Sequence, residues 1–216
     1  MASESYLSLL ACVYSLTVDR VSKRFGARKV FADVSFSLQT GEALAIVGPN
    51  GSGKTTLVLL LLGQYHLLKG TITYARDGAK LPEEELRRRT ALVSPYLNLY
   101  DHLTAEENLI FLSTVAGGSV SGREVDDLLA SVGLEGRGHD LVGAYSSGMK
   151  QRLKYAAALM KKPDFLFLDE PTSNLDEAGK QIVFDLIRDY RRKAVVIIAT
   201  NEPKEQELAD HVCRVA

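Results

Sequence analysis

A glycine-rich motif limits the folds open to this chain more than any other stretch. Residues 48–56 read GPNGSGKTT and fit the pattern of glycine, four residues, glycine, lysine, then serine or threonine. An apolar run, 43–47, precedes the motif and another, 57–62, follows it. Glycines let the backbone curl with its N–H groups inward, and a helix start near Lys54 adds a positive end. The stretch therefore predicts a phosphate-binding loop between a strand and a helix.

The residue types inside this loop suit the phosphates of a nucleotide. Lys54 can place a full positive charge on the outer phosphates. The hydroxyl of Thr55 can bind Mg²⁺, an ion that keeps several waters and shares phosphate oxygens. We assign nucleotide binding to the whole loop, which consists of Gly48, Pro49, Asn50, Gly51, Ser52, Gly53, Lys54, Thr55 and Thr56.

Length and composition favour one sizeable domain. The chain has 216 residues, of which 46% are hydrophobic and 25% charged, as in a soluble globular protein. A net charge of -1 offers no basic surface, so nucleic acid is not an expected partner. The longest uncharged stretch, 6–18, is too short to span a membrane, and Cys12 and Cys213 lack the spacing of metal ligands. We interpret 13–216 as a single domain and 1–12 as an extension of uncertain order.

Strand and helix patterns alternate along the chain. Residues 14–18 and 30–38 alternate apolar with polar side chains, which is typical of an antiparallel sheet with one buried face. The runs 43–47, 164–168 and 194–200 do not alternate, as expected of strands covered on both faces. Other strands are expected at 71–74 and 91–94, and helices at 57–62, from Pro82 to 89, at 104–115, 124–132 and 177–192. This order predicts a parallel sheet with ligands at the carboxyl ends of its strands.

Two acidic residues follow the apolar run at 164–168. Asp169 and Glu170 stand at the carboxyl end of the expected strand, and Pro171 stops it there. Asp169 would orient Mg²⁺ or its water shell, and Glu170 would polarise the water that attacks the γ-phosphate. The alternative is an acidic pair at the surface without chemistry.

A second helix start suited to an anion lies at 145–153, YSSGMKQRL. Ser146 is a suitable N-cap, and Gly148 leaves room for close approach in the first turn. One chain therefore carries two helix N-termini that can bind phosphate.

From about residue 14 onward the chain resembles the ATP-binding subunits of ABC transporters. GPNGSGKTT matches the Walker A loop, FLFLDEPT at 165–172 matches Walker B, YSSGM stands where the family has LSGGQ, and SNLD at 173–176 is similar to the D-loop. Phe25 occupies the place of the aromatic residue that stacks on adenine. The fold implied is α/β: a P-loop NTPase core with a mainly parallel sheet, an N-terminal antiparallel β layer and an α-helical subdomain inserted at about 96–160.

The resemblance implies an ATPase subunit that needs ATP and Mg²⁺ and closes as a homodimer around two ATP molecules. Ser146, Ser147 and Gly148 of one subunit would bind the nucleotide held by Lys54 of the other. It further implies transmembrane permease subunits as partners and a cytoplasmic location, peripheral on the membrane through those partners. The signature SSGMKQR is most similar to ABC-2 and haem-exporter subunits, which favours export.

Three places depart from the family pattern. Pro95 stands at the Q-loop glutamine, Asn201 at the switch histidine, and Ser147 and Met149 replace glycine and glutamine in the signature. Asn201 can exchange hydrogen bonds but cannot carry a proton charge near neutral pH. The catalytic candidates are Glu170, Lys54 and Asn201. A nucleotide-binding regulatory or assembly module with slow or no turnover is the alternative to a working ATPase.

The loop PYLNLYDHL at 95–103 is unusually rich in aromatic and leucine side chains. Exposed side chains of this kind suggest a docking surface, and the family has a membrane subunit at this place. The alternative is that Tyr96, Leu97, Leu99 and Tyr100 pack under the helical insertion.

Overall fold

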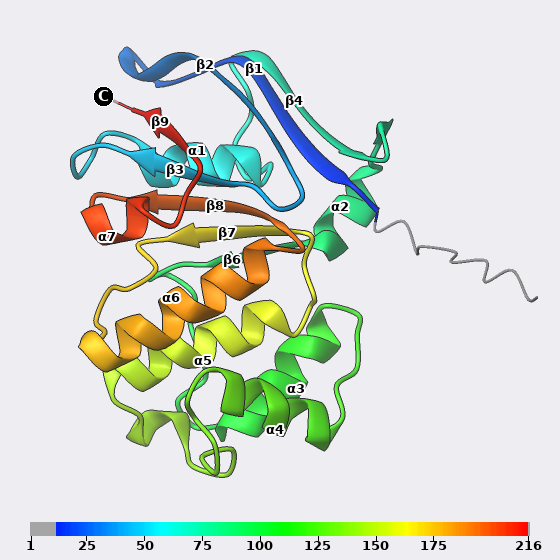
Figure 1. Ribbon diagram of the computed structural model, residues 1–216, viewed down its shortest axis with the longest axis vertical. Coiled ribbons are helices and arrows are strands. Elements are labelled where there is room, and N and C mark those ends of the chain that lie inside the picture. Colours follow the sequence, from blue (N-terminus) through cyan, green and yellow to red (C-terminus); the bar gives the residue numbers. More distant parts are fainter. Residues whose placement is uncertain (1–11, 216) are drawn as a thin grey trace, which may run out of the picture.

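Two β-sheets and a layer of helices make up the computed structural model, which describes residues 12–215 (Figure 1). Most of the extension expected at 1–12 lies outside these residues. The strands are β1 (Tyr14–Phe25), β2 (Arg28–Gln39), β3 (Ala43–Val47), β4 (Lys69–Arg76), β5 (Ala79–Lys80), β6 (Thr90–Val93), β7 (Phe165–Asp169), β8 (Val195–Thr200) and β9 (His211–Arg214). The helices are α1 (Lys54–Leu61), α2 (Glu83–Arg89), α3 (Ala105–Val115), α4 (Gly122–Ser131), a 3₁₀ turn (Val142–Ala144), α5 (Ser147–Leu159), α6 (Glu177–Arg191) and α7 (Pro203–Gln206).

The first sheet is antiparallel, with strand order β2-β1-β4-β5, and confirms the layer predicted from alternating residues. Leu16 of β1 faces Leu38 of β2 on one side and Tyr74 of β4 on the other, and all three are buried. β1 and β2 are longer than expected because they continue as a two-stranded hairpin that turns at Gly26, where φ is +55°. This hairpin carries Phe25 beyond the body of the sheet.

The second sheet is parallel throughout, with strand order β6-β7-β8-β3-β9. Every residue of β3, β7 and β8 is buried, so the prediction of central strands covered on both faces is confirmed. The edge strand β9 was not predicted. Three of its four residues are exposed, so no apolar run marks it.

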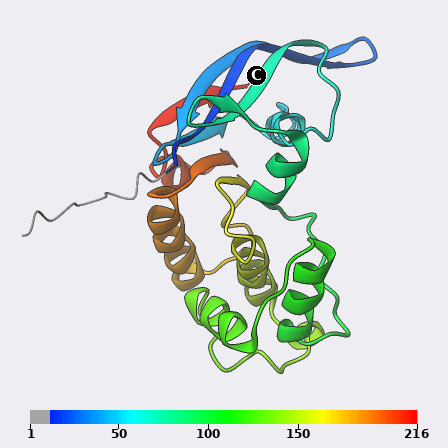
Figure 2. The same cartoon turned by 90° about the vertical axis from the view of Figure 1, so that its right-hand side faces the viewer.

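Two hydrophobic clusters fill the space on the two faces of the parallel sheet. On one face, Phe165, Phe167, Val195 and Ile197 pack with α1 and the antiparallel sheet. On the other face, a cluster that includes Leu166, Leu168, Val196 and Ile198 joins the sheet to α5 and α6, and α3 and α4 pack beyond α5 (Figures 1 and 2). Alternate side chains of each central strand thus serve different layers.

Local sequence signals set several helix ends. Thr104 and Glu107 form the predicted capping box at the start of α3. Ser121 and Glu124 form another at α4, so this helix begins two residues earlier than the predicted position 124. Pro82 precedes α2 as expected, and the three predicted i,i+4 Glu–Arg pairs form along it.

Within residues 12–215, no helix has both the length and the apolar character needed to cross a bilayer.

Candidate functional site

The carboxyl ends of β3, β7 and β8 and the N-terminal ends of α1, α5 and α6 lie along one edge of the molecule, at the left in Figure 1. β3 leads into the glycine-rich loop, β7 ends in Asp169, and β8 is followed by Asn201. Parallel strands present their ligand-binding groups at this edge, so three separate segments of the chain meet there.

The glycine-rich loop packs closely against two other segments of the chain. Gly53 has φ of +104°, and a Cβ there would lie 2.4 Å from Cγ1 of Val30. A Cβ on Gly48 would lie 2.3 Å from the carbonyl oxygen of Val215. Neither position has room for a side chain, which explains the two glycines.

Lys54 is the first residue of α1 and is only 6% exposed. Its Nζ donates hydrogen bonds to the carbonyl oxygens of Gly48 (2.8 Å) and Pro49 (3.2 Å). The ammonium group is therefore folded back over the loop, where it lies close to any anion that the loop N–H groups bind.

Asp169 lies against the loop and is almost fully buried. Its Oδ2 accepts a 2.8 Å hydrogen bond from Oγ1 of Thr55, and its Oδ1 is buried without a hydrogen-bond partner in the described part of the chain. Burial raises the pKa of the Asp169 carboxyl, the Thr55 bond opposes that rise, and the adjacent charge of Glu170 adds to it. An unpaired buried oxygen on a carboxylate is costly unless another group satisfies it.

Thr55 and Asp169 fit a bound Mg²⁺. A hydroxyl and a carboxylate oxygen are the hard ligands this ion takes, and it obtains the rest from phosphate and water. Among residues 12–215, no group of three or more His, Cys, Asp or Glu side chains could hold a metal by itself, so phosphate oxygens would be needed.

Glu170 lies just beyond β7 in an uncommon backbone conformation. Its φ is +49°, and its N–H donates to the carbonyl oxygen of Ala199 in β8 (2.9 Å). Non-glycine residues at positive φ are strained and cluster at functional sites. The exposed Glu170 side chain borders a polar groove of about 320 Å³ that Asn50 and Asn201 also line.

Asn201 contacts the phosphate-binding loop directly. Its Nδ2 donates to Oδ1 of Asn50 at 3.2 Å, a contact between residues 151 positions apart. The structure thus brings Asn50, Glu170 and Asn201 to one groove.

Phe25 and the loop border a second groove, of about 350 Å³. Phe25 is 47% exposed at the end of β1. The other lining residues are Arg28, Val30, Gly51, Gly53, Lys54, Thr55 and Thr56. An aromatic ring therefore stands at one end of a groove whose other end is the phosphate-binding loop.

The second predicted anion site forms the start of α5. Oγ of Ser146 accepts a 3.2 Å hydrogen bond from N–H of Met149, so Ser146 is the N-cap as predicted. Ser146 and Ser147 are exposed, and a Cβ on Gly148 would lie 3.3 Å from the carbonyl oxygen of Asn174. Neither of the two grooves beside the phosphate loop is lined by these three residues. This helix start faces solvent within the single chain.

Sequence reasoning missed Glu205, a buried acid beneath the site. It is 2% exposed in α7, and its Oε1 accepts hydrogen bonds from N–H (3.0 Å) and Oγ1 of Thr172. At the preceding residue, Tyr155 and Gln151 of α5 donate hydrogen bonds to the carbonyl oxygen of Pro171 at 3.0 and 3.3 Å. The segment that follows Glu170 is thereby fixed from two helices. No pattern in 201–208 distinguishes Glu205 from the exposed Glu202 and Glu207.

Lys154 was also missed. Its Nζ donates to the carbonyl oxygens of Pro95 (2.9 Å) and Ser94 (3.3 Å), and burial lowers its pKa. The start of the loop at Ser94 and Pro95 is thus held by a lysine from α5.

The loop that follows Pro95 has some of its aromatic and leucine side chains exposed and others packed. Tyr96 and Tyr100 are 78% and 50% exposed, whereas Leu99 packs against the core. Tyr100 contacts Phe111 of α3 edge to face at 5.1 Å, and the buried Asn108 bonds both the N–H and the carbonyl of Tyr100. The aromatic side chains are therefore exposed on an ordered surface.

Comparison with known proteins settles the family. The model of the family described as "ABC transporter" matches residues 31–173, more than half of the chain. The chain belongs to the ABC transporter family.

Relatives and solved structures agree with this ABC assignment. The chain is 36% identical to the Nod factor export ATP-binding protein I of Burkholderia lata over 197 residues, 89% of this chain and 65% of that protein. It is 36% identical to the ABC transporter ATP-binding protein YxlF of Bacillus subtilis over 201 residues, 92% of this chain and 65% of that one. This ABC chain thus spans just under two thirds of the length of these relatives.

A bacterial Atm1-family ABC exporter with ATP bound has a similar structure. The TM-score is 0.80 at 25% identity, over 94% of this chain and 37% of the exporter chain. The α/β fold predicted for an ABC ATP-binding subunit is therefore confirmed.

Proposed function

We propose that this chain hydrolyses ATP as the ATP-binding subunit of an ABC exporter. One observation carries the proposal: the phosphate loop, the buried Asp169, whose Oδ1 has no partner within residues 12–215, and Glu170 meet at one edge of the parallel sheet. This arrangement offers positioning and charge neutralisation, which are the main requirements of phosphoryl transfer.

In this proposal the loop residues 48–56 bind the phosphates through N–H groups, and Phe25 stacks on the adenine. Lys54 leaves the carbonyl oxygens of its own loop to contact the outer phosphates. Thr55 and Asp169 would hold Mg²⁺, which when bound would neutralise charge on the phosphates.

Glu170 and Asn201 would act on the far side of the γ-phosphate. Glu170 orients and polarises the attacking water. Asn201 donates a hydrogen bond toward the γ-phosphate from Nδ2, the atom that bonds Asn50 in the free chain. The shared groove of about 320 Å³ supports this pairing of roles.

We infer that the active form is a homodimer. The exposed start of α5, with Ser146, Ser147 and Gly148, would bind the nucleotide held by the phosphate loop of a second copy. Its exposure to solvent and its separation from the grooves beside its own phosphate loop support this role.

We also infer transmembrane permease subunits as partners, and hence a location at the cytoplasmic face of a membrane. The exposed Tyr96 and Tyr100, with Ile110 and Phe111 of α3, form an apolar surface suited to such a subunit. The relative named for Nod factor export and the Atm1-family exporter support export as the direction of transport. Residues 13–216 would act as one domain with the helices of about 96–160 inserted, because one hydrophobic cluster joins these helices to the sheet.

A regulatory or assembly module with slow turnover is the second candidate, favoured by Pro95 and Asn201. Steady-state ATPase measurements on the purified chain, alone and with a co-purified membrane protein, separate the two. Turnover that Glu170→Gln abolishes supports the enzyme. ATP binding without turnover in either preparation supports the module instead.

A further inference from the structure

Tyr65 lies in the connection between α1 and β4 and contacts the candidate base-binding residue. The centroid of its ring is 5.5 Å from that of Phe25, and the ring planes meet at 79°. Nζ of Lys23 lies 5.0 Å from both centroids and donates a 2.9 Å hydrogen bond to the carbonyl oxygen of His66. We call Lys23, Phe25 and Tyr65 the aromatic–cation cluster. Edge-to-face rings and a cation near both are mutually attractive arrangements.

Phe25 depends on this cluster because the sheet gives it little support. The pairing of β1 with β4 ends at Ser22 and Lys69, three residues before Phe25. Beyond that point β1 pairs only with β2, and Phe25 faces Arg28 at the turn of the hairpin. A two-stranded hairpin is marginally stable by itself. The Phe25 ring therefore relies on side-chain contacts, which include those with Lys23 and Tyr65.

The same helix holds the two ends of the proposed nucleotide site. The phosphate loop leads into the N-terminal end of α1, and the connection that carries Tyr65 leaves its C-terminal end. A helix of this length spans about 12 Å, at about 1.5 Å per residue. Because α1 is packed between the two sheets, both of its ends are held in place, and Tyr65 follows the C-terminal end by four residues.

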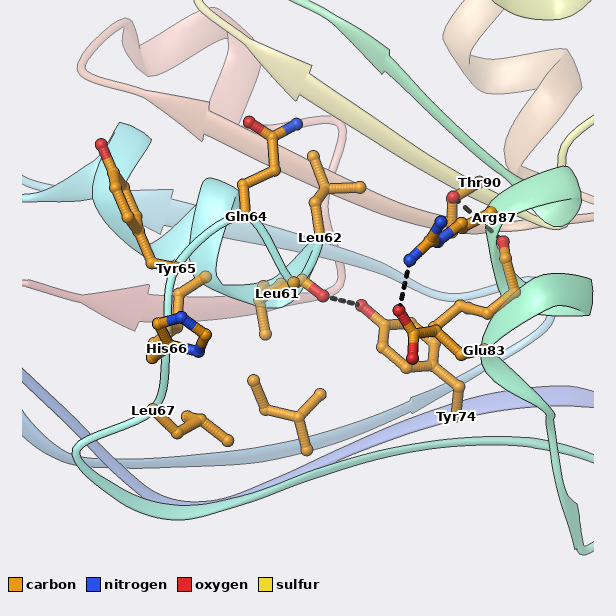
Figure 3. A pocket seen from close by; sticks show the side chains of 14 residues that line it. Leu61, Leu62, Gln64, Tyr65, His66, Leu67, Tyr74, Glu83, Arg87 and Thr90 are labelled. Carbon is orange, nitrogen blue, oxygen red and sulfur yellow. Dashed lines mark hydrogen bonds and ion pairs between the residues drawn. The ribbon is translucent and has the colours of Figure 1, made fainter. Parts of the chain in front are cut away.

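The other side of this connection borders a separate hollow of about 480 Å³ (Figure 3). Gln64, Tyr65, His66 and Leu67 stand opposite Tyr74, whose hydroxyl donates to the carbonyl oxygen of Leu61 at 2.8 Å. Leu67 shares the loop and the hollow with Tyr65 but is not part of the aromatic–cation cluster. It provides a matched control.

We infer that Tyr65 is a positioning residue that holds Phe25 in place to stack on the adenine base, and so contributes to the affinity of the site for ATP. This inference rests on the proposed ATP site. It assigns no role in hydrolysis to Tyr65, so its test is a binding measurement.

The test compares Mg-ATP with inorganic tripolyphosphate, which offers the phosphates without the base, by calorimetry on the full chain. Tyr65→Leu should weaken ATP binding about two- to tenfold, the range that one aromatic pair contributes. Tripolyphosphate affinity should stay unchanged. Tyr65→Phe and Leu67→Ala should both bind ATP as the original chain does. In the double variant, Tyr65→Leu should cause no loss of ATP affinity beyond that caused by Phe25→Leu alone.

Three results would overturn the inference. Unchanged ATP affinity in Tyr65→Leu, when Phe25→Leu binds weakly, would show that Phe25 needs no support from Tyr65. Equal loss of ATP and tripolyphosphate affinity would show a general structural effect on α1. An unchanged ATP affinity in Phe25→Leu would remove the proposed base site itself, a failure distinguishable from the other two.

Discussion

Oγ1 of Thr55 donates a 2.8 Å hydrogen bond to Oδ2 of Asp169, joining the first turn of α1 to the end of β7. The bond leaves Oδ1 of the same carboxylate buried and unpaired within the described residues. Before any ligand binds, the chain therefore holds a buried carboxylate oxygen that has no hydrogen-bond partner among the described residues, and the charge of Lys54 only partly opposes the effect of burial. This state costs free energy that a cation at the site would recover.

Asp169→Asn should stabilise the ligand-free protein and abolish its response to Mg²⁺. Burial raises the pKa of Asp169, so the folded chain binds this proton more tightly than the unfolded chain. The carboxyl therefore favours folding at pH values below the pKa it has in the unfolded chain, and this contribution is lost as pH rises through the raised pKa of the folded state. At neutral pH the Asp169→Asn variant does not bear the cost of burying an ionised carboxylate. Each kcal/mol that it gains in the free energy of unfolding shifts the melting temperature of a domain this size by about 2 to 4 °C.

Thermal unfolding from pH 4 to 8 measures this effect. The melting temperatures of the two forms should converge toward the acid end and separate at neutral pH. A variant that melts lower than the original chain at pH 7 without ligand would contradict the argument.

Lys54→Ala should weaken ATP binding by about 1.5 to 3 kcal/mol, the contribution of a charge-assisted hydrogen bond. Isothermal calorimetry with Mg-ATP measures the loss. Lys80→Ala, which removes an exposed lysine from β5, is the matched control and should bind normally. Full affinity in Lys54→Ala would show that Nζ stays on the loop carbonyls when ATP is bound.

Glu170→Gln should retain Mg-ATP and lose turnover, because the amide keeps the shape of the side chain but cannot polarise water as a carboxylate does. Gel filtration with Mg-ATP should then show a stable dimer. Glu207→Gln, at an exposed acid, should turn over as the original chain does. A monomeric Glu170→Gln variant that hydrolyses ATP at the original rate would show that another group orients the attacking water.

Asn201→His should raise the ATPase rate of the chain about tenfold if the imidazole adds about 1.4 kcal/mol of stabilisation in the transition state. Its ring N–H can replace the bond to Asn50, and a protonated ring adds a charge near the γ-phosphate. KM should change little because the gain lies in the transition state. Steady-state kinetics at several pH values check this. A lower kcat in a folded variant would mean that the groove is adapted to asparagine.

Much of the fold was predictable from residue patterns with a local cause. The apolar runs of β3, β7 and β8 predicted buried parallel strands because both faces are covered. β9 could not be predicted, since its exposed residues form a strand only by pairing with β3, which lies far away in the sequence. α7 has only four residues and no side-chain cap, so Pro203 at its start was too weak a signal to predict it.

The candidate site likewise contains residues that could be predicted from the sequence and residues that could not. The phosphate loop, Asp169 and Glu170 stand in motifs whose spacing reflects their chemistry. Tyr65, Lys154 and Glu205 lie outside those motifs and matter through contacts with distant segments: Lys154 meets Ser94 across 60 positions, and Glu205 meets Thr172 across 33. Such contacts follow from packing, which a single sequence does not display.

The edge strand β9 gives the phosphate loop a neighbour whose surface can be labelled. Arg214 is exposed and lies in register with Val47, the residue before the loop, and the next carbonyl closes against Gly48. A spin label at Arg214→Cys, with Cys12 and Cys213 replaced by serine, would stand beside the loop without occupying either groove. The chain contains no tryptophan whose fluorescence could report on the site. Electron paramagnetic resonance of the spin label could instead follow nucleotide entry and release, independently of turnover.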